Sequence, residues 1–420
     1  MKVLLIGSGG RESSLAWKIS QSSLLSHLYI APGNPGTDLY GVNIDIKEND
    51  VNTLLEFATV NEIDITIVGP EVPLALGIVD LFNNSNLKIF GPTKLSASLE
   101  SSKSFAKKIM ETRNIPTAFS QSFDNYELAC QYVNDISSSI VVKADGLASG
   151  KGVYVCNTKS EALEALKILM IDQKHGLSGS KVLLEECLYG WEASVFVFSD
   201  GYDVSDMVVA CDHKRIGNGD TGPNTGGMGA FSPPHQWDDE IEELVKETIV
   251  IPVIDEMRNN YDPYVGVLFV GLMITNEGPK VIEFNCRFGD PETQVILPLL
   301  DSDILSVIES CVNGTLSHEK ILWSDSACVC VVAASEGYPN DYKTGHPIAG
   351  INLIERDVNI FYAGTESGVH GDLVTSGGRV LSVSAVRESV SQAANVCYEN
   401  IGKISYQGIY YRNDIARQNE

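Results

Sequence analysis

The sequence predicts a multidomain protein of mixed α/β and α+β class, with a doubly wound parallel sheet at its N-terminus. The chain has 420 residues, which is enough for about two to four domains. Its first hundred residues alternate short apolar runs with amphipathic stretches, as expected for a parallel sheet covered by helices on both faces. Its last hundred residues contain several short apolar runs, which predict a small strand-rich domain.

In the first hundred residues, the apolar runs predict four strands and the 3.6-residue periodicity predicts three helices. The strands are expected at residues 3–6, 28–31, 65–69 and 88–91, and the helices around 13–20, 51–60 and 74–82. The turns GSGG, APGNPG and GPE follow three of these strands. Because ligands bind at the carboxyl ends of strands in open α/β sheets, we expect these turns to face one crevice.

A polar, serine-rich stretch at residues 96–104 separates this unit from the next. From Ile109 to Glu186 the pattern predicts strand, helix and strand, and two consecutive strands are expected at 264–275 and 280–285. The last part of the chain reads as a separate unit. It has strands near 327–334 and 379–386 and a helix near 390–401.

Composition and charge exclude several classes of protein. The formal charge of -25 is opposite in sign to that of a global nucleic-acid binder. No apolar run approaches the ~18–20 residues that span a bilayer, and the first apolar run is too short for a signal sequence. The nine cysteines form no C-x2-C pair, which favours reduced, packed thiols. We therefore expect a cytoplasmic protein with no membrane or nucleic-acid partner.

The motif GSGGRESS, residues 7–14, lies where a strand leads into a helix, the usual place for a phosphate-binding turn. It is not a dinucleotide fingerprint, because Glu12 stands where the third glycine belongs and Ala31 and Pro32 end the second strand where an acidic residue is needed. A tight turn made by Gly9 and Gly10 is the structural alternative. Arg11 at the helix start favours an anion site.

The segment KADGLASGKGV, residues 143–153, combines glycines and lysines between two expected strands. Such a loop can lay backbone N–H groups and a cation over a polyphosphate. It differs from a Walker A loop, because Gly146 and Gly150 are four residues apart and Gly152 follows the lysine. A plain glycine-rich hairpin is the alternative.

The segment VIEFNCRFGDPET, residues 281–293, places Glu283 and Asn285 on one face of a strand. A carboxylate and an amide oxygen suit a hard cation such as Mg2+ that also binds nucleotide phosphates. Arg287 and Asp290 follow on a turn. A buried ion-pair network is the alternative explanation of these charges.

Two further segments carry candidate sites. DHKR, residues 212–215, precedes the glycine-rich GPNTGGMGAF, residues 222–231, which together predict an anion lid, with a solvated β-turn as the alternative. LLEECL, residues 183–188, and Glu192 read as an interdomain hinge that faces a base and a ribose, with an ordinary strand and turn as the alternative.

In this order, the motifs GGRE, APGNPGT, GPE, FGPT, KADGLASGKGV, DHKR with GPNTGGMGA, and VIEFNCRFGDPET closely resemble those of the phosphoribosylamine–glycine ligase family (glycinamide ribonucleotide synthetases) of the ATP-grasp superfamily. The resemblance runs from Met1 to beyond Arg379, which lies in TSGGRVL, residues 375–381. It implies a truncated Rossmann-like substrate-binding domain at 1–100, an ATP-grasp domain at 101–323 with a small lid at about 118–189, and a C-terminal domain at 324–420.

The family's reaction joins glycine to 5-phosphoribosylamine, with ATP as a substrate, through a glycyl phosphate intermediate in de novo purine (IMP) biosynthesis. The resemblance thus implies an ATP-dependent, C–N bond-forming ligase that uses Mg2+ or Mn2+ and works on small molecules, and we expect a monomer. Another ATP-grasp carboxylate–amine ligase, or a carboxylase acting on a phosphoribosyl substrate, is the alternative.

The resemblance also assigns roles to individual residues. The catalytic residues are expected to be Arg287, Asp290 and Lys214, and the metal ligands Glu283 and Asn285. The ATP site is expected at Lys103, Lys143, Gly146, Ser149, Gly150, Lys151, Gly152, Glu185, Glu186, Leu188 and Glu192. The substrate site is expected at Gly9, Gly10, Arg11, Glu12, Gly33, Asn34, Pro70, Glu71, Asn224, Thr225, Gly226, Gly227 and Met228.

This sequence departs from the family's GNGGREH motif at two positions, where Ser8 and Ser13 replace the asparagine and the histidine. Ser13 lies in the first turn after the GSGG loop, so its side chain can point toward the proposed phosphate site. If backbone N–H groups and Arg11 mainly hold the phosphate, we expect position 13 to be secondary.

Overall fold

The computed structural model describes residues 1–147, 152–174 and 176–417. Its N-terminal unit contains a parallel sheet with the strand order β3-β2-β1-β4-β5, and the four strands expected there are confirmed. β1 is buried on both faces, as its unbroken apolar sequence requires. The strands are β1 (Lys2–Gly7), β2 (His27–Pro32), β3 (Val42–Asn43), β4 (Ile65–Val68) and β5 (Ile89–Phe90).

The helices of this unit are α1 (Gly10–Ile19), α2 (Val51–Val60), α3 (Glu71–Leu76) and α4 (Ile78–Asn84). The prediction of a single helix at 74–82 is wrong, because the helical conformation is interrupted between α3 and α4. The break lies at Gly77, whose φ of +90° belongs to the left-handed region that favours glycine.

The serine-rich stretch forms helices rather than a linker. Ser102 caps the second of them by accepting a hydrogen bond from the Phe105 amide. The strand expected at Ile109 is therefore wrong, because this residue is fully buried on one face of an amphipathic helix. These helices are α5 (Ser98–Ser101) and α6 (Lys103–Arg113).

Residues 120–186 form a small subdomain with a four-stranded sheet of order β6-β9-β7-β8 and a core of its own. The glycine-rich segment joins β7 to β8, as expected. The elements are β6 (Ser120–Phe123), α7 (Tyr126–Asp135), β7 (Ile140–Ala144), β8 (Val153–Cys156), α8 (Lys159–Leu166) and β9 (Val182–Glu186).

A large sheet connects the middle of the chain with its C-terminal part, in the order β16-β15-β10-β11-β14-β17-β21-β18. The strands and helix expected after residue 323 are confirmed, but the C-terminal unit is not detached. Residues 229–232 of β14 pair with β17 from Cys328 to Val331. The second glycine-rich segment, residues 222–231, thereby links the central and C-terminal units.

The central elements are β10 (Trp191–Asp200), β11 (Val208–Asp212), β12 (Arg215–Gly217), β13 (Thr221–Asn224), β14 (Gly229–Ser232), α9 (Asp239–Val245), α10 (Ile251–Asn260), β15 (Val265–Thr275), β16 (Gly278–Asn285), α11 (Thr293–Ile296) and α12 (Ile304–Asn313). The C-terminal elements are β17 (Ala327–Ser335), β18 (Val358–Tyr362), β19 (Thr365–Ser367), β20 (Leu373–Thr375), β21 (Arg379–Arg387), α13 (Val390–Ile401) and β22 (Ile409–Tyr410).

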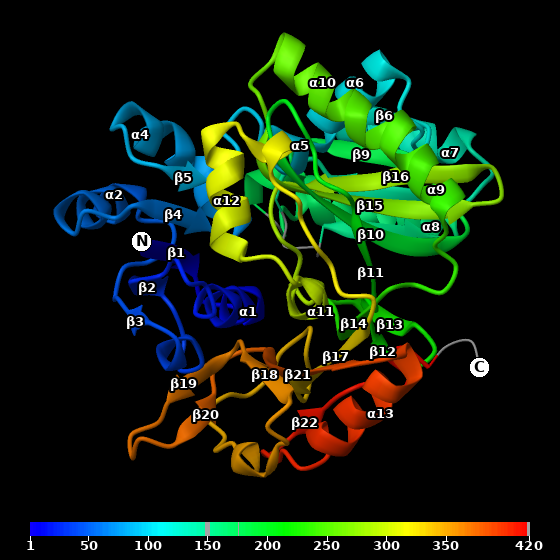
Figure 1. The fold of residues 1–420 in the computed structure, drawn as a ribbon. Coiled ribbons are helices and arrows are strands. Elements are labelled where there is room, and N and C mark those ends of the chain that lie inside the picture. The colour runs from blue at the N-terminus through cyan, green and yellow to red at the C-terminus, as the bar shows by residue number, and fades with distance from the viewer. Residues whose placement is uncertain (148–151, 175, 418–420) are drawn as a thin grey trace.

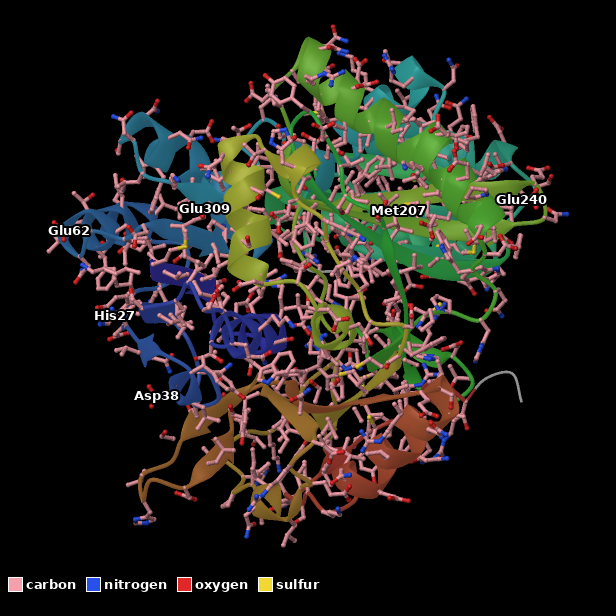
Figure 2. All side chains as sticks on the ribbon, viewed as in Figure 1. His27, Asp38, Glu62, Met207, Glu240 and Glu309 are labelled. Carbon is pink, nitrogen blue, oxygen red and sulfur yellow. The ribbon has the colours of Figure 1, made fainter. Side chains whose placement is uncertain are left out.

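In Figure 1 the N-terminal unit lies to the left, the central unit at the upper right and the C-terminal unit below both. Exposed residues such as His27 and Glu62 lie at the outer edge of the N-terminal unit (Figure 2). Within the described residues, no helix is long and apolar enough to cross a bilayer.

We predict that Gly229→Ala destabilises the protein, because β14 and β17 approach closely there. An added Cβ would lie 2.6 Å from the carbonyl oxygen of Cys330 and 2.8 Å from the Ile415 side chain. The expected loss is about 1–3 kcal/mol of unfolding free energy, measured by urea denaturation. Gly402→Ala is the control, since its Cβ would come no closer than 3.3 Å to a neighbouring atom. Equal midpoints for the two variants would contradict the packing described.

Candidate active site

A cavity of about 590 Å³ lies where the N-terminal, central and C-terminal units meet. The predicted residues that line it are Gly9, Arg11, Glu12, Pro70, Glu71, Lys103, Lys143, Gly152, Glu185, Glu186, Leu188, Glu192, Lys214, Asn224, Thr225, Gly226, Glu283, Asn285, Arg287 and Asp290. Most residues singled out from scattered motifs are thus brought together in one place.

Other predicted residues do not line this cavity, and for most of them a packing role is visible. Gly33 and Asn34 line a separate crevice of about 350 Å³, where the Asn34 amide bridges the carbonyls of Ser8 and Tyr362. Gly146 packs against Ser178, and Gly227 adopts a φ of +110° beside Pro291. Gly10 and Met228 also lie outside the cavity lining, and Ser149, Gly150 and Lys151 lie outside the described residues.

One end of the cavity holds a buried cluster of two lysines and a carboxylate. Lys143 Nζ on β7 lies 2.6 Å from Glu185 Oε2 on β9, and Lys107 Nζ on α6 lies 3.0 Å from Glu185 Oε1. Burial alone would raise the pKa of Glu185, but Lys143 and Lys107 together lower it. The cluster carries a net positive charge beside the cavity, which suits an anionic ligand.

Apolar side chains line the cavity near this cluster, from α6, from strands of both the small subdomain and the large sheet, and from the segment that follows β9. They include Ala106, Met110, Val141, Val153, Val155, Leu188, Met273 and Ile282. A slot with apolar walls next to a cationic group fits a flat heterocycle joined to phosphates. Glu186, at the rim, accepts a hydrogen bond from the Phe119 amide at 3.0 Å.

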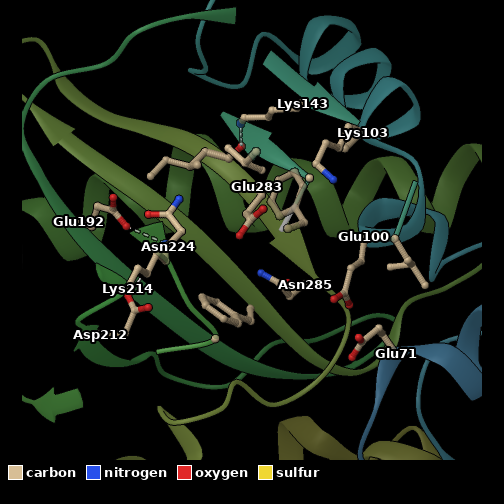
Figure 3. A pocket seen from close by; sticks show the side chains of 18 of the residues that line it. Glu71, Glu100, Lys103, Lys143, Glu192, Asp212, Lys214, Asn224, Glu283 and Asn285 are labelled. Atoms are coloured by element: carbon tan, nitrogen blue, oxygen red, sulfur yellow. Dashed lines mark hydrogen bonds and ion pairs between the residues drawn. The ribbon is translucent and has the colours of Figure 1, made fainter. Parts of the chain in front are cut away.

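Glu283 and Asn285 point into the cavity from β16, with Lys103 and Lys143 on one side and Lys214 and Asn224 on the other (Figure 3). Burial alone would raise the pKa of Glu283, but Lys214, Lys103 and Lys143 lower it below its ordinary value. No hydrogen bond or ion pair to its carboxylate occurs within 1–147, 152–174 and 176–417. An ionised carboxylate without a partner fits a divalent cation with oxygen ligands. The Oδ1 of the neighbouring Asn285 accepts a hydrogen bond from Arg287 Nη2 at 3.2 Å, so it would have to be shared with, or released from, this contact to bind the cation.

A second group of charges surrounds Lys214, which precedes β12. Its Nζ lies 2.6 Å from Glu192 Oε2 and 4.0 Å from Asp212 Oδ1. Burial raises the pKa of Asp212 to about 7, although Lys214 opposes the shift. Burial also raises the pKa of Glu292 nearby. This side of the cavity can therefore hold a proton on a carboxyl group near neutral pH.

The turn after β16 brings the three units together. Arg287 makes ion pairs with Glu71 at 3.3 Å and with Glu100 at 2.9 Å. Asp290 makes an ion pair with Arg379 of β21 at 3.2 Å and accepts a hydrogen bond from the Arg11 amide at 3.3 Å. The charges that the sequence placed on this turn thus fix the N-terminal and C-terminal units against the central sheet.

At the N-terminus of α1, carboxylates of the protein already occupy two of the backbone donors. The Gly9 amide donates a hydrogen bond to Glu12 Oε2 at 2.7 Å. The Arg11 amide donates one to Asp290 Oδ2 at 3.3 Å. The Arg11 guanidinium contacts Glu12 Oε1 at 2.5 Å and the Phe288 carbonyl at 3.2 Å. Arg11 is therefore an oriented part of the cavity wall rather than a freely moving cation.

The side chain of Ser13 does not point toward the proposed phosphate site, although its place in the first turn allowed this. Ser13 is completely buried, and its hydroxyl accepts a hydrogen bond from the Tyr362 amide at 3.1 Å. The residue packs α1 against β18, because the C-terminal unit covers this face of the helix. Its role is to join two units.

Sequence reasoning missed six charged residues of the cavity, namely Glu48, Glu100, Lys107, Asp212, Glu292 and Arg379. Asp212 and Glu292 lie inside two of the recognised motifs, so their charge and their position beside Lys214 and Arg287 were a usable signal. Arg379 lies more than 85 residues beyond Asp290, its partner in the turn after β16. Its position after TSGG was the only sequence signal for a site there.

Comparisons with known proteins agree with this architecture. Residues 101–293 match the ATP-grasp (A) domain of phosphoribosylglycinamide synthetase, which places the chain among ATP-grasp proteins. Residues 1–100 match the N domain of the same family and residues 328–418 its C domain. The chain therefore belongs to the phosphoribosylglycinamide synthetase family, and the fold class expected from the sequence is confirmed.

Relatives from distant organisms are similar over nearly the whole chain. A phosphoribosylamine–glycine ligase of Caldanaerobacter subterraneus is 47% identical, with 99% of each chain covered. A trifunctional purine biosynthetic protein, adenosine-3, of Gallus gallus is 46% identical, with 99% of this chain but 42% of the relative covered. The crystal structure of phosphoribosylamine–glycine ligase from Thermotoga maritima has a TM-score of 0.85 at 31% identity, covering 99% and 100% of the two chains.

The same fold occurs at much lower identity in a biotin carboxylase of Campylobacter jejuni, with a TM-score of 0.73 at 14% identity. The two chains are covered over 98% and 92% of their lengths. At this identity the similarity concerns the fold alone.

We predict that Asp212 makes the ligand-free protein less stable as the pH rises. The ordinary pKa of an aspartate is 3.8, and burial raises the pKa of Asp212 to about 7 in the folded state, which therefore binds this proton more tightly than the unfolded state does. Stability therefore falls between about pH 4 and 7, by up to about 1.4 kcal/mol per pH unit. Asp212→Asn should flatten this slope in urea unfolding at pH 5 and 8.

The exposed Asp206→Asn is the matched control and should keep the slope of the parent protein. If Asp212→Asn and the parent lose equal stability between the two pH values, Asp212 is ionised throughout and the electrostatic description of this side is wrong.

Proposed function

We propose that this protein joins glycine to 5-phosphoribosylamine, with cleavage of ATP, and forms glycinamide ribonucleotide, ADP and phosphate in purine biosynthesis. The observation that carries the proposal is that motifs spread over the whole chain line one cavity. The family match over all three parts of the chain and the names of its full-length relatives support it.

ATP is proposed to bind between the small subdomain and the large sheet. The adenine would enter the apolar slot beside Glu186 and Leu188, and Glu192 would face the ribose. Lys103 and Lys143 are proposed to contact the phosphates. Burial lowers the pKa of Lys103, so a polyphosphate would compensate a cation that has lost much of its hydration. Gly152 lines the cavity near these lysines, whereas residues 148–151 of the loop expected to close over the phosphates lie outside the described residues.

Glu283 and Asn285 are proposed to hold Mg2+ or Mn2+. Together with ATP phosphates and water, the two residues would supply the oxygen ligands that such a cation prefers. When bound, such a cation neutralises phosphate charge and orients the phosphoryl group for transfer.

In the first step, a carboxylate oxygen of glycine attacks the γ-phosphorus of ATP. The bond from this phosphorus to the β–γ bridging oxygen breaks, which leaves ADP and glycyl phosphate. Attacker and target are both anions, so the step depends on cations held in place before it starts. Lys103, Lys143, Lys214 and Arg287 line the cavity around Glu283 and supply that charge.

In the second step, the amine of phosphoribosylamine attacks the carbonyl carbon of glycyl phosphate, phosphate leaves, and the amine loses a proton. The chain needs no nucleophile of its own for this acyl transfer. We propose that phosphoribosylamine binds on the side lined by Gly9, Arg11, Pro70 and Glu71, opposite the apolar slot.

The boundaries 1–100, 101–323 and 324–420, with a lid at about 118–189, remain our proposal for the domains. Monomeric state and cytoplasmic location remain predictions as well.

An assay of ADP release with ATP and glycine, with and without freshly made phosphoribosylamine, tests the proposed reaction. We expect sustained release only when all three substrates are present. Release that depends on glycine and bicarbonate, or that ignores phosphoribosylamine, would favour another ATP-grasp reaction.

We predict that Glu283→Gln folds normally but loses most of its turnover. An amide cannot supply the negative charge that holds a divalent cation, and single electrostatic contributions of this kind are worth about 3 kcal/mol, or more than 100-fold in kcat. ADP release at saturating Mg2+ measures the effect.

Glu277→Gln, on the exposed turn before the same strand, is the matched control and should keep full turnover. Turnover of Glu283→Gln within threefold of the parent would show that Glu283 is not a metal ligand.

A further inference from the structure

A short hairpin, made of β12 and β13, connects Lys214 to Asn224. Its two strands form a sheet of their own, with no third strand in the described part of the chain to stabilise it. We call residues 215–224 the ribbon. An isolated two-stranded ribbon is marginally stable in water, so its position must be fixed from outside.

The support comes from the C-terminal segment, residues 410–416, which runs beside the ribbon. The Tyr410 hydroxyl donates to the Ile216 carbonyl at 2.9 Å, and the Asn413 amide donates to Asn218 Oδ1 at 3.0 Å. Asp414 Oδ2 accepts the Gly219 amide at 2.7 Å. These contacts reach both the first strand and the turn of the ribbon.

Arg412 is the centre of this contact and has an exposed fraction of 0%. Its Nη1 donates to the Arg215 carbonyl at 3.0 Å and to Asp220 Oδ1 at 2.7 Å. Its Nε and Nη2 donate to the two carboxylate oxygens of Asp414, both at 2.8 Å. One rigid fork thus holds the start of the ribbon, its turn and the C-terminal segment together.

His213, next to Lys214, completes the arrangement. Its Nε2 accepts the Ala416 amide at 3.3 Å, and its Nδ1 lies 3.8 Å from Asp220 Oδ1. His213 and Arg412 together hold the pKa of Asp220 well below its usual range. The C-terminal segment therefore supports the chain on the side of Lys214 as well as at the turn.

Burying an arginine costs desolvation free energy, and well-packed apolar residues in its place often stabilise a protein as much or more. A fork that reaches three separate segments gives what apolar packing does not, namely a fixed position for each of them. A fixed position is needed at the two ends of the ribbon, because the residues there line the cavity. They are Lys214, Asn224, Thr225 and Gly226.

We propose that Arg412 is a positioning residue for the ligase reaction, which acts by fixing the ribbon so that Lys214 and Asn224 face the substrates. The proposal rests on the proposed function for its catalytic half. Arg412 lies outside the cavity lining, so it is not placed to contact a substrate. Its loss therefore affects the reaction through the ribbon.

Two variants of the full chain test this. Arg412→Met removes the fork, and Asp220→Asn, on the half-exposed turn, removes the charge it pairs with while keeping the size of the side chain. In both variants, we expect the amide hydrogens of residues 215–224 to exchange with solvent about tenfold faster than in the parent protein, or more. We expect kcat/KM for phosphoribosylamine to fall about tenfold or more in Arg412→Met and less in Asp220→Asn.

Arg412→Lys, which keeps the charge but not the fork, should recover only part of the loss. Arg417→Met is the matched control, because this arginine stacks on Tyr398 and contacts Asn395 rather than the ribbon. It should exchange and react like the parent.

Unchanged exchange in a folded Arg412→Met, or faster exchange with kcat/KM within twofold of the parent, overturns the proposal. If Arg412→Met does not fold, parent-like exchange and activity in Asp220→Asn overturn it instead. A parent protein that forms no glycinamide ribonucleotide would contradict the proposed function, whereas the exchange measurements would still decide whether Arg412 orders the ribbon.

Discussion

The turn after β16 holds the three units of the molecule together through charged contacts. Arg287 is paired with Glu71 and Glu100, and Asp290 with Arg379 and the amide of Arg11. Breaking one partner of a largely buried pair leaves a charge without compensation, at a cost of about 3–5 kcal/mol. Because the turn directly follows Glu283 and Asn285, the contacts that join the units also fix the position of the proposed metal ligands.

The charges inside the cavity are arranged in two regions with different properties. Lysines lower the pKa of Glu283 and of Glu185, which keeps both ionised. Near Lys214, burial raises the pKa of Asp212 and Glu292. A polyphosphate and a divalent cation suit the first region, and the loss of a proton from an amine suits the neighbourhood of the second.

The cavity also depends on parts of the chain that never reach it. Gly227 turns the chain with a φ of +110°, so that Gly226 before it lines the cavity while Met228 after it enters the C-terminal core. Ser13 joins α1 to β18. In both places a residue of a recognisable motif has a structural task, and its neighbour in sequence lines the cavity.

Much of this could be predicted from local sequence patterns. The strands of the N-terminal sheet are apolar runs, and the alternation of a strand placed Glu283 and Asn285 on one face. Such patterns report only on near neighbours in the chain. The break at Gly77 depends on a left-handed turn in an otherwise helical pattern.

Arg379 and Glu100 reach the cavity by tertiary approach from distant segments, and the C-terminal unit covers Ser13. No periodicity in the sequence encodes these contacts. The predicted substrate residues Gly33 and Asn34 show the same limit, since their motif was recognised but the fold places them in another crevice.

In the proposed reaction, the cavity activates the carboxylate of glycine by phosphoryl transfer from ATP. The most direct measurement uses glycine labelled with 18O in its carboxylate, together with ATP and phosphoribosylamine, and mass analysis of the released phosphate. If glycyl phosphate forms, the oxygen that bridges carbon and phosphorus leaves with the phosphate, so each phosphate carries one 18O atom. Release of unlabelled phosphate during formation of glycinamide ribonucleotide would contradict the account.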